Sequence, residues 1–272
     1  MKTRIIVAAV GLPLLLVVLI VLKPVFLTVL LAAMLIIAAA ELFRAAGGAP
    51  NRRVLIVTMA FAALTPFAVY FGLGQVGFFA IFMPLMAYNF AEAIAAFGKE
   101  KKIKFEDILV SLFAGALIPW LLCCMLSLKM MEKGAYYVVM VCVITMISDS
   151  GGYFAGYFLG KHKVTPHVSP NKTLEGFIGS FLSAIAGLML FGLIAGLIGK
   201  FSVNYLYLLI YAVCGNIFTQ LGDLSFSLIK RQYGIKDYGN LLPGHGGILD
   251  RFDSMIFTAP VVYILIMLIP AF

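Results

Sequence analysis

The residues best suited to chemistry are concentrated near the C-terminus, in the segment Ser227–Asp253. It combines five glycines with basic and acidic residues and one histidine, namely Lys230, Arg231, Lys236, Asp237, His245, Asp250, Arg251 and Asp253. Glycines such as Gly246 and Gly247 allow the backbone to approach a ligand closely, and turns with free backbone N–H groups bind anions. Basic side chains add charge for phosphate, and aspartates supply oxygen ligands for Mg²⁺. The segment therefore predicts a phosphate and metal site, the alternative being a basic loop held at anionic lipid headgroups.

A second group lies along one helical face just before this segment and consists of Asn216, Gln220 and Asp223. A carboxylate in or near hydrocarbon costs about 2.5–3.5 kcal/mol to insert, so its default interpretation is functional. Asp223 precedes the segment and Asp250 opens the next apolar stretch. If these two stretches pack side by side, both carboxylates meet, and we predict that they hold a divalent metal. The alternative for Asp223 is a pair with a neighbouring lysine or a helix cap.

Two further polar groups lie in the middle of the chain. The run Ser148–Gly152 interrupts an apolar stretch, which is tolerated only where it faces protein or a wet cavity. We expect Asp149 to face the same cavity as Asp223, with a kinked helix and a structural hydrogen bond as the alternative. The loop Lys161–Gly176 leads into another apolar stretch, and Lys172 is placed to meet a phosphate at that helix N-terminus.

Long apolar helices must position these groups, because 63% of the 272 residues are hydrophobic, 12% are charged and the mean hydropathy is +1.07. Such a chain has too little polar surface to cover a soluble core. This excludes a disordered chain and, despite a pI of about 9.3, a soluble nucleic-acid-binding protein. Nine apolar stretches are continuous rather than alternating, which favours helices over a membrane barrel. They are Ile5–Leu22, Val25–Ala40, Val54–Phe71, Val76–Ala96, Ile108–Leu128, Ala135–Leu159, Phe177–Ile198, Val203–Phe226 and Ser254–Phe272.

We therefore predict an all-α polytopic membrane protein with about nine transmembrane helices. It is expected to form a single membrane domain over residues 1–272, with an apolar scaffold in residues 1–140 and a motif-bearing half in residues 141–272. Ile5–Leu22 has no cleavage site after it and is interpreted as a retained span rather than a signal peptide. Basic residues favour the cytoplasmic side, and a cytoplasmic N-terminus places 16 of them in inside loops and 4 in outside loops. The N-terminus and the site are thus expected on the cytoplasmic side.

The Ser227–Asp253 segment resembles the signature of the phosphatidate cytidylyltransferases, also called CDP-diacylglycerol synthases. Its pattern is Ser-x-x-Lys-Arg, four residues, Lys-Asp, and then Pro-x-His-Gly-Gly-x-x-Asp-Arg-x-Asp. The stretches Ser169–Gly176 and Ser148–Tyr153 are also similar to that family, although Ser150 stands where the family usually has threonine. The resemblance implies a homodimeric enzyme of the bacterial inner membrane that makes CDP-diacylglycerol and pyrophosphate from CTP and phosphatidic acid. It also implies Mg²⁺ as a cofactor and links K⁺ to the site.

The resemblance further assigns roles to individual residues. Asp223 and Asp250 match the family's metal-binding pair, and Asp149 and Asp253 are weaker metal candidates. The expected catalytic residues are Asp223, Asp250, Lys172, Lys230, Arg231, His245 and Arg251. The expected substrate-binding residues are Ser169, Asn171, Lys172, Thr173, Glu175, Ser227, Lys236, Asp237, Gly246 and Gly247. The lipid phosphate would attack the α-phosphorus of CTP, and catalysis would consist mainly of positioning and charge neutralisation.

Two other classes of function compete with this hypothesis. A secondary transporter also has broken helices and carboxylates inside the membrane, although here the polar groups gather at one membrane face and no halves repeat. A CTP-dependent lipid-alcohol kinase, such as a polyprenol kinase, shares the substrate and metal chemistry without the long signature. A purely structural scaffold would not place costly aspartates in its spans.

Overall fold

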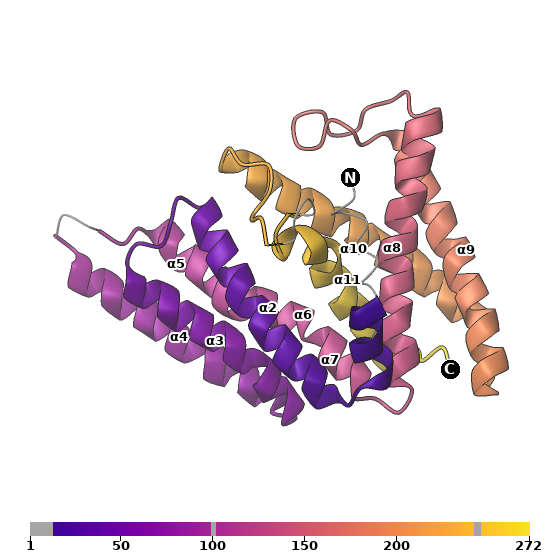
Figure 1. Cartoon of the computed structure of the whole chain (residues 1–272), viewed down its shortest axis with the longest axis horizontal. Coiled ribbons are helices and arrows are strands. Elements are labelled where there is room, and N and C mark those ends of the chain that lie inside the picture. The colour runs from indigo at the N-terminus through magenta and orange to yellow at the C-terminus, as the bar shows by residue number, and fades with distance from the viewer. Residues whose placement is uncertain (1–12, 99–101, 242–245) are drawn as a thin grey trace. The chain divides into compact units, whose positions relative to one another are not determined.

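The computed structural model describes residues 13–98, 102–241 and 246–272. These residues form helices joined by connections of differing length (Figure 1), and no β-strand occurs among them. An isolated bridge between Lys163 and Thr173 is formed within the loop that precedes one of the helices. The prediction of an all-α protein is therefore confirmed.

Eight helical stretches in the described part of the chain are long and apolar enough to cross a membrane. They are α2 (Pro24–Ala45), α3 (Arg52–Tyr70), α4 (Gly74–Ala96), the stretch Phe105–Lys129, α8 (Gly134–Leu159), α9 (Leu174–Gly199), α10 (Tyr205–Gln232) and α11 (Leu249–Leu268). They correspond to the last eight of the nine predicted spans. The first predicted span lies partly outside the described residues, and the π-helical turn η1 (Val17–Val21) forms part of its described end. The total of nine spans and the cytoplasmic N-terminus stay predictions.

The stretch Phe105–Lys129 is made of four consecutive pieces rather than one regular helix. They are α5 (Phe105–Leu112), the π-helical turn η2 (Phe113–Leu117), α6 (Ile118–Leu122) and α7 (Cys124–Lys129). Pro119 follows the π turn and has no backbone N–H to continue a regular ladder. Gly115 lies in this turn and has no room for a side chain, because a Cβ there would come within 2.9 Å of Thr58 Cγ2 on α3.

The helices are grouped into two compact units. The first consists of Met1–Met130 and Gln232–Phe252, and the second of Met131–Arg231 and Asp253–Phe272. The chain therefore passes from one unit to the other three times, between Met130 and Met131, at the end of α10 and in the first turns of α11. The prediction of a single membrane domain stays a prediction.

A buried polar cluster links three helices of the first unit. The Thr58 and Ser111 hydroxyl oxygens lie 2.6 Å apart, and the Asn89 side-chain amide donates to the Ser111 hydroxyl at 3.0 Å. All three side chains are almost completely buried, and they come from α3, α5 and α4. Because lipid gives little hydrophobic drive to bring helices together, interhelical hydrogen bonds and close packing carry much of this task.

In the second unit, α8 and α9 lie side by side at very close approach (Figure 1). A Cβ on Gly152 would lie 3.2 Å from the Gly176 carbonyl oxygen, and one on Gly151 would lie closer still to the Ser183 hydroxyl. The polar run Ser148–Gly152 lies inside α8, which is continuous from Gly134 to Leu159 and matches the predicted span Ala135–Leu159. Small residues occupy this run so that two helices can approach, as is common in membranes.

The helices also extend further into the motif segment than its composition indicated. The α10 helix continues to Gln232, so Ser227, Lys230 and Arg231 are helical residues, and α11 already begins at Leu249. Asp250 stands in the first turn of α11, where an acidic residue favours a helix N-terminus. The prediction of one long connection over Ser227–Asp253 is therefore wrong, and only residues 233–248 join the two helices.

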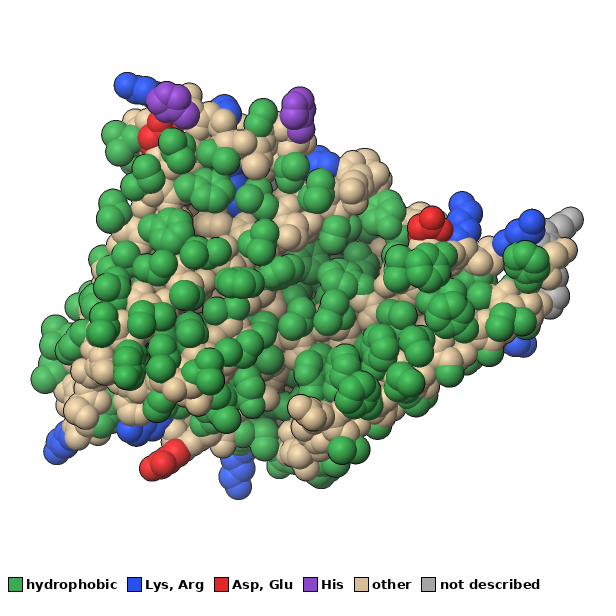
Figure 2. Space-filling view, turned by 180° about the vertical axis from the view of Figure 1, so that it is seen from behind, with side chains coloured by type: hydrophobic (Ala, Val, Ile, Leu, Met, Phe, Trp, Pro, Cys, Tyr) green, Lys and Arg blue, Asp and Glu red, His purple; other side chains and the backbone are tan. Residues whose placement is uncertain are grey.

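The outer surface fits helices that face lipid. Hydrophobic side chains cover most of the face drawn in Figure 2. Large apolar residues such as Val76 and Ile94 on α4, and Leu182 and Leu197 on α9, are exposed. Soluble proteins rarely expose contiguous apolar surface on this scale, which supports the membrane assignment.

Candidate functional site

A cavity of about 600 Å³ lies in the second unit, between α8, α9, α10 and the loop that precedes α9. It brings together residues from three of the polar groups that the sequence singles out. Its lining residues are Asp149, Gly152, Tyr153, Gly156, Tyr157, Lys163, Asn171, Lys172, Thr173, Gly176, Phe177, Gln220 and Asp223. Asp149 and Asp223 therefore line one cavity, which is the placement expected from the sequence.

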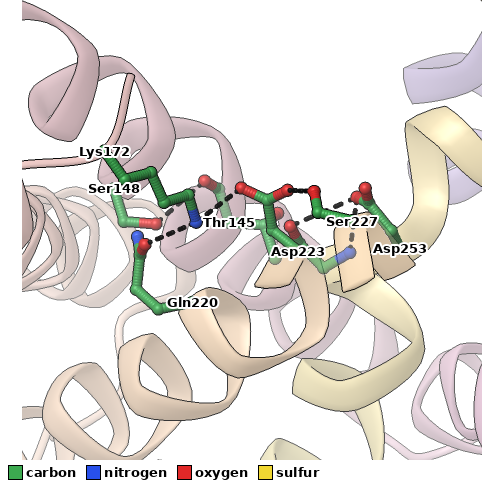
Figure 3. A network of polar contacts seen from close by, with 8 residues as sticks. Thr145, Ser148, Lys172, Gln220, Asp223, Ser227 and Asp253 are labelled. Atoms are coloured by element: carbon green, nitrogen blue, oxygen red, sulfur yellow. Dashed lines mark hydrogen bonds and ion pairs between the residues drawn. The ribbon is translucent and has the colours of Figure 1, made fainter. Parts of the chain in front are cut away.

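Lys172 and Asp223 form an ion pair in this cavity. The Lys172 Nζ lies 2.6 Å from Asp223 Oδ2 and donates to Gln220 Oε1 at 3.1 Å (Figure 3). The same ammonium lies 5.6 Å from the centre of the Phe177 ring, within the range of a cation–π contact. Asp223 thus has the lysine partner that its alternative interpretation proposed, and this lysine is one of the predicted phosphate-binding residues.

The predicted polar face of α10 is directed toward α9 and the preceding loop. Asn216 is buried, and its side-chain amide donates to the Ser180 hydroxyl of α9 at 3.1 Å. One turn further on, Gln220 contacts Lys172, and the Ser227 hydroxyl donates to Asp223 Oδ1 at 3.3 Å. Hydrogen bonds from two sides therefore hold the Asp223 carboxylate in place.

Carboxylates outnumber lysines around Asp223. Asp149 on α8 and Asp253 on α11 both interact electrostatically with Asp223. Two lysines supply the opposite charge. Lys172 attracts the Asp149 carboxylate, and Lys230 attracts the Asp253 carboxylate. Among the described residues no group of three or more His, Cys, Asp or Glu lies close enough to hold a metal by itself. The excess of hard oxygen donors nevertheless fits a cation such as Mg²⁺, which takes one or two carboxylates and completes its shell with water and phosphate.

The loop before α9 is shaped so that Lys172 reaches the cavity. Thr173 caps α9, its hydroxyl oxygen accepting from the Gly176 N–H at 3.1 Å, as is typical of threonine at this position. Glu175, in the first turn, accepts from the backbone N–H groups of Lys161 and His162 at 3.0 and 3.3 Å. These contacts close the loop on itself. Glu175, predicted to bind substrate, is thus engaged in ordering this loop.

The remaining predicted residues of this loop, Asn171 and Ser169, differ in their exposure. Asn171 is exposed and lines the cavity, whereas Ser169 is partly buried, and its N–H donates to the Thr165 carbonyl. From the end of α10, Arg231 Nε donates to the Val168 carbonyl at 3.3 Å. Arg231 therefore ties α10 to the loop that carries Lys172.

Three aromatic residues and a lysine in the wall were missed by the sequence analysis. Tyr153 and Tyr157 stand one turn apart on α8, and their rings are stacked with centres 6.2 Å apart. Phe177 and Lys163 complete this side of the cavity. The signal for the tyrosines was their spacing of four residues directly after the Ser148–Gly152 run, which puts both on the helix face of Asp149.

The first unit contains the other half of the predicted site. Asp250 Oδ2 accepts from the backbone N–H groups of Tyr238 and Gly247 at 2.8 and 2.9 Å. Gly246 has a φ of +86°, and a Cβ there would lie 2.8 Å from Asp250 Oδ2. Asp250 therefore organises the backbone of the motif segment around its own carboxylate.

The structure describes three more of the predicted residues of the motif segment. Lys236, Asp237 and Arg251 are exposed. His245 lies outside the described residues. The predicted metal pair joins Asp223 of the second unit with Asp250 of the first, and it stays a prediction.

Comparisons with known proteins point to one family. The model of the Cytidylyltransferase family matches residues 2–269. The chain is 47% identical over 137 residues to the phosphatidate cytidylyltransferase of Bacillus subtilis (strain 168), covering 50% of this chain and 49% of the relative. It is 43% identical over 137 residues to that of Staphylococcus haemolyticus and 44% identical over 136 residues to that of Staphylococcus aureus (strain COL), covering 50% of each chain. The matches thus span about half the length of these curated relatives. Because the family model covers nearly the whole chain, the protein belongs to the cytidylyltransferase family.

Proposed function

We propose that this protein is a phosphatidate cytidylyltransferase, which transfers CMP from CTP to phosphatidic acid and releases pyrophosphate. The observation that carries the proposal is the cavity in which Lys172 meets Asp223 and Asp149 among membrane helices. The family supports the transfer of a cytidylyl group, and the names of the relatives support phosphatidic acid as the acceptor.

The composition of the cavity suits two phosphate-bearing substrates of unequal solubility. CTP is a water-soluble polyanion, whereas phosphatidic acid is held in the bilayer by its acyl chains. Lys163 and Lys172 supply positive charge, and the cavity reaches the N-terminus of α9, where the helix dipole favours anions. The exposed tyrosines of α8 give the same cavity an apolar, aromatic side.

In the proposed reaction a phosphate oxygen of phosphatidic acid attacks the α-phosphorus of CTP. A new P–O bond forms to the lipid phosphate, and the bond between the α-phosphorus and the bridging oxygen breaks as pyrophosphate leaves. A phosphomonoester oxygen is already a nucleophile, so no covalent enzyme intermediate is required. The task of the protein is to position both phosphates and to neutralise their charge.

The side chains of this chain divide these tasks. Lys172 is held beside the cavity by Asp223 and Gln220, and its ammonium donates hydrogen bonds to substrate phosphate. Lys230, Arg231 and Arg251 extend the positive charge toward the leaving pyrophosphate. Asp250 keeps the backbone of the motif segment folded.

We propose Mg²⁺ as the cofactor, held by Asp223 and Asp250 with Asp149 and Asp253 as weaker candidates. The carboxylates that outnumber the lysines around Asp223 support this assignment. When bound, Mg²⁺ supplies positive charge that stabilises the phosphates of the transition state. K⁺ at the site, a homodimer, the bacterial inner membrane and a cytoplasmic opening are proposals that rest on the same resemblance and on the distribution of basic residues.

Two labels in CTP test the proposed reaction. The full chain, purified in detergent with phosphatidic acid and Mg²⁺, is given CTP labelled in cytidine or in the γ-phosphate. We expect the cytidine label to enter the lipid fraction and the γ-phosphate label to stay in water as pyrophosphate. Entry of the γ-phosphate label into lipid would instead indicate a kinase, and no transfer of either label would favour a transporter.

A further inference from the structure

One buried carboxylate in the first unit plays no part in the mechanism above. Glu41 lies near the C-terminal end of α2 and is 2% exposed. Its Oε1 accepts from the Ile248 N–H at 3.0 Å, and its Oε2 accepts from the Leu249 N–H at 3.0 Å. An ionisable residue buried in a membrane helix is costly and therefore demands a specific partner. For Glu41 that partner is the start of α11, more than 200 residues away in the sequence.

The motif segment is shaped around this carboxylate. A Cβ on Gly239 would lie 2.5 Å from Glu41 Oε1 and 3.0 Å from its Cδ. A Cβ on Gly247 would approach the same carboxylate even more closely. Contacts below 3.0 Å require something to move, and a buried carboxylate that accepts two hydrogen bonds cannot move freely. Glu41 thus explains why two positions of the segment are glycine.

The same backbone turn also binds Asp250. The Gly247 N–H donates to Asp250 Oδ2, and the next two N–H groups along the chain donate to Glu41. Three successive amides are therefore divided between two carboxylates. A carboxylate at a helix N-terminus is also favoured by the helix dipole, so Glu41 stabilises the turn from which Asp250 projects.

We propose that Glu41 is a positioning residue, whose carboxylate holds the first turn of α11 and thereby sets the direction of the Asp250 side chain for cytidylyl transfer. The effect on catalysis rests on the proposed function, whereas the contact with α11 does not. A purely structural Glu41 would lower the amount of folded protein without changing the rate of each folded molecule.

The substitution Glu41→Gln tests the contact. Glutamine keeps the size of the side chain but turns one acceptor oxygen into an NH₂ group, which faces a backbone N–H. We expect hydrogen–deuterium exchange of the Ile248 and Leu249 amides to rise about tenfold, the factor for losing one hydrogen bond to a charged group. Glu92→Gln is the matched control, because Glu92 is another carboxylate of the first unit and hydrogen-bonds to Tyr88 and Asn51. It should leave both amides protected.

Kinetics on folded, monodisperse protein test the effect on the reaction. Glu41→Gln should lower kcat about tenfold and leave KM for CTP within about twofold of wild type. The substitution disturbs the alignment of the Asp250 side chain for the reaction and does not remove a contact with CTP. Glu92→Gln should leave both constants unchanged. A wild-type kcat for Glu41→Gln, or amides that stay protected, would overturn the proposal.

A double-mutant cycle with Gly239→Ala adds a readout specific to this pair. The new methyl group should lower kcat about tenfold in the wild-type background, because it meets the Glu41 carboxylate. In the Glu41→Ala background the space is free, so the same substitution should cost no more than about twofold. Equal losses in both backgrounds would contradict the proposal. If wild-type protein makes no CDP-diacylglycerol, the proposed function fails, and the exchange experiment still decides whether Glu41 holds α11.

Discussion

Replacement of Lys172 by methionine separates a role in phosphate binding from a role in folding. Methionine has a similar length and can still pack beside Phe177, but it carries no ammonium group. Asp223 then loses the cation that lies 2.6 Å from its Oδ2, and Gln220 loses its hydrogen-bond donor. The substitution therefore removes charge from the cavity with little change in volume.

From the structure we expect the rate of cytidylyl transfer to fall far more than the stability of the fold. The Lys172 and Asp223 side chains are 18% and 32% exposed, so water partly screens their attraction. An ion pair in such surroundings contributes about 1 kcal/mol or less to folding. A charge-assisted hydrogen bond to phosphate is worth about 1.5–3 kcal/mol, which corresponds to a loss of about 10- to 150-fold in kcat/KM.

The assay follows the cytidine label from CTP into lipid, normalised to folded protein, together with the thermal unfolding midpoint in detergent. Lys102→Met is a matched control, because Lys102 is exposed in the first unit and outside the proposed site. A wild-type rate for Lys172→Met would refute the role in phosphate binding. A loss of rate that only parallels a loss of folded protein would refute it as well.

Three further predictions address the metal, the motif segment and the cap of α9. Asp250→Asn should lower cytidylyl transfer by at least about 100-fold while the protein remains monodisperse, and activity within tenfold of wild type would contradict its role. Excess chelator should stop turnover and added Mg²⁺ should restore it, so that continued turnover in chelator would exclude the metal. Thr173→Ala should destabilise the protein by about 1 kcal/mol through loss of the N-cap hydrogen bond, whereas Thr173→Ser, which keeps the hydroxyl, should unfold at the wild-type temperature.

The helices could be predicted because each span is a long, continuous apolar run, and such a run has few structural solutions in a membrane. Local composition misled where packing decides the structure. Gly151 and Gly152 were interpreted only as part of a polar run in an apolar helix, whereas in the structure they let α9 approach an unbroken α8. The polar end of α10 read as a loop, although its residues extend the helix to Gln232.

The sequence indicates which residues form the site, but it does not indicate which of them contact one another. Lys172 and Asp223 were both expected, but they lie 51 positions apart in the sequence, which hides the fact that they form an ion pair. Glu41 was missed for a related reason. It is a single acidic residue in an apolar run, and its hydrogen-bond partners lie 207 and 208 residues further along the chain. Its presence at that depth was the one available signal, because a membrane helix seldom carries an acid without a partner.

The most direct test of the central claim compares wild-type protein with Asp223→Asn, using CTP labelled at the α-phosphate and phosphatidic acid in mixed micelles, with Glu92→Gln as control. We expect labelled CDP-diacylglycerol from wild type and Glu92→Gln, and at least a 100-fold lower rate from folded Asp223→Asn, because the carboxylate that holds Lys172 and the proposed Mg²⁺ is lost. Equal transfer by Asp223→Asn, or no labelled lipid from wild type, would contradict it.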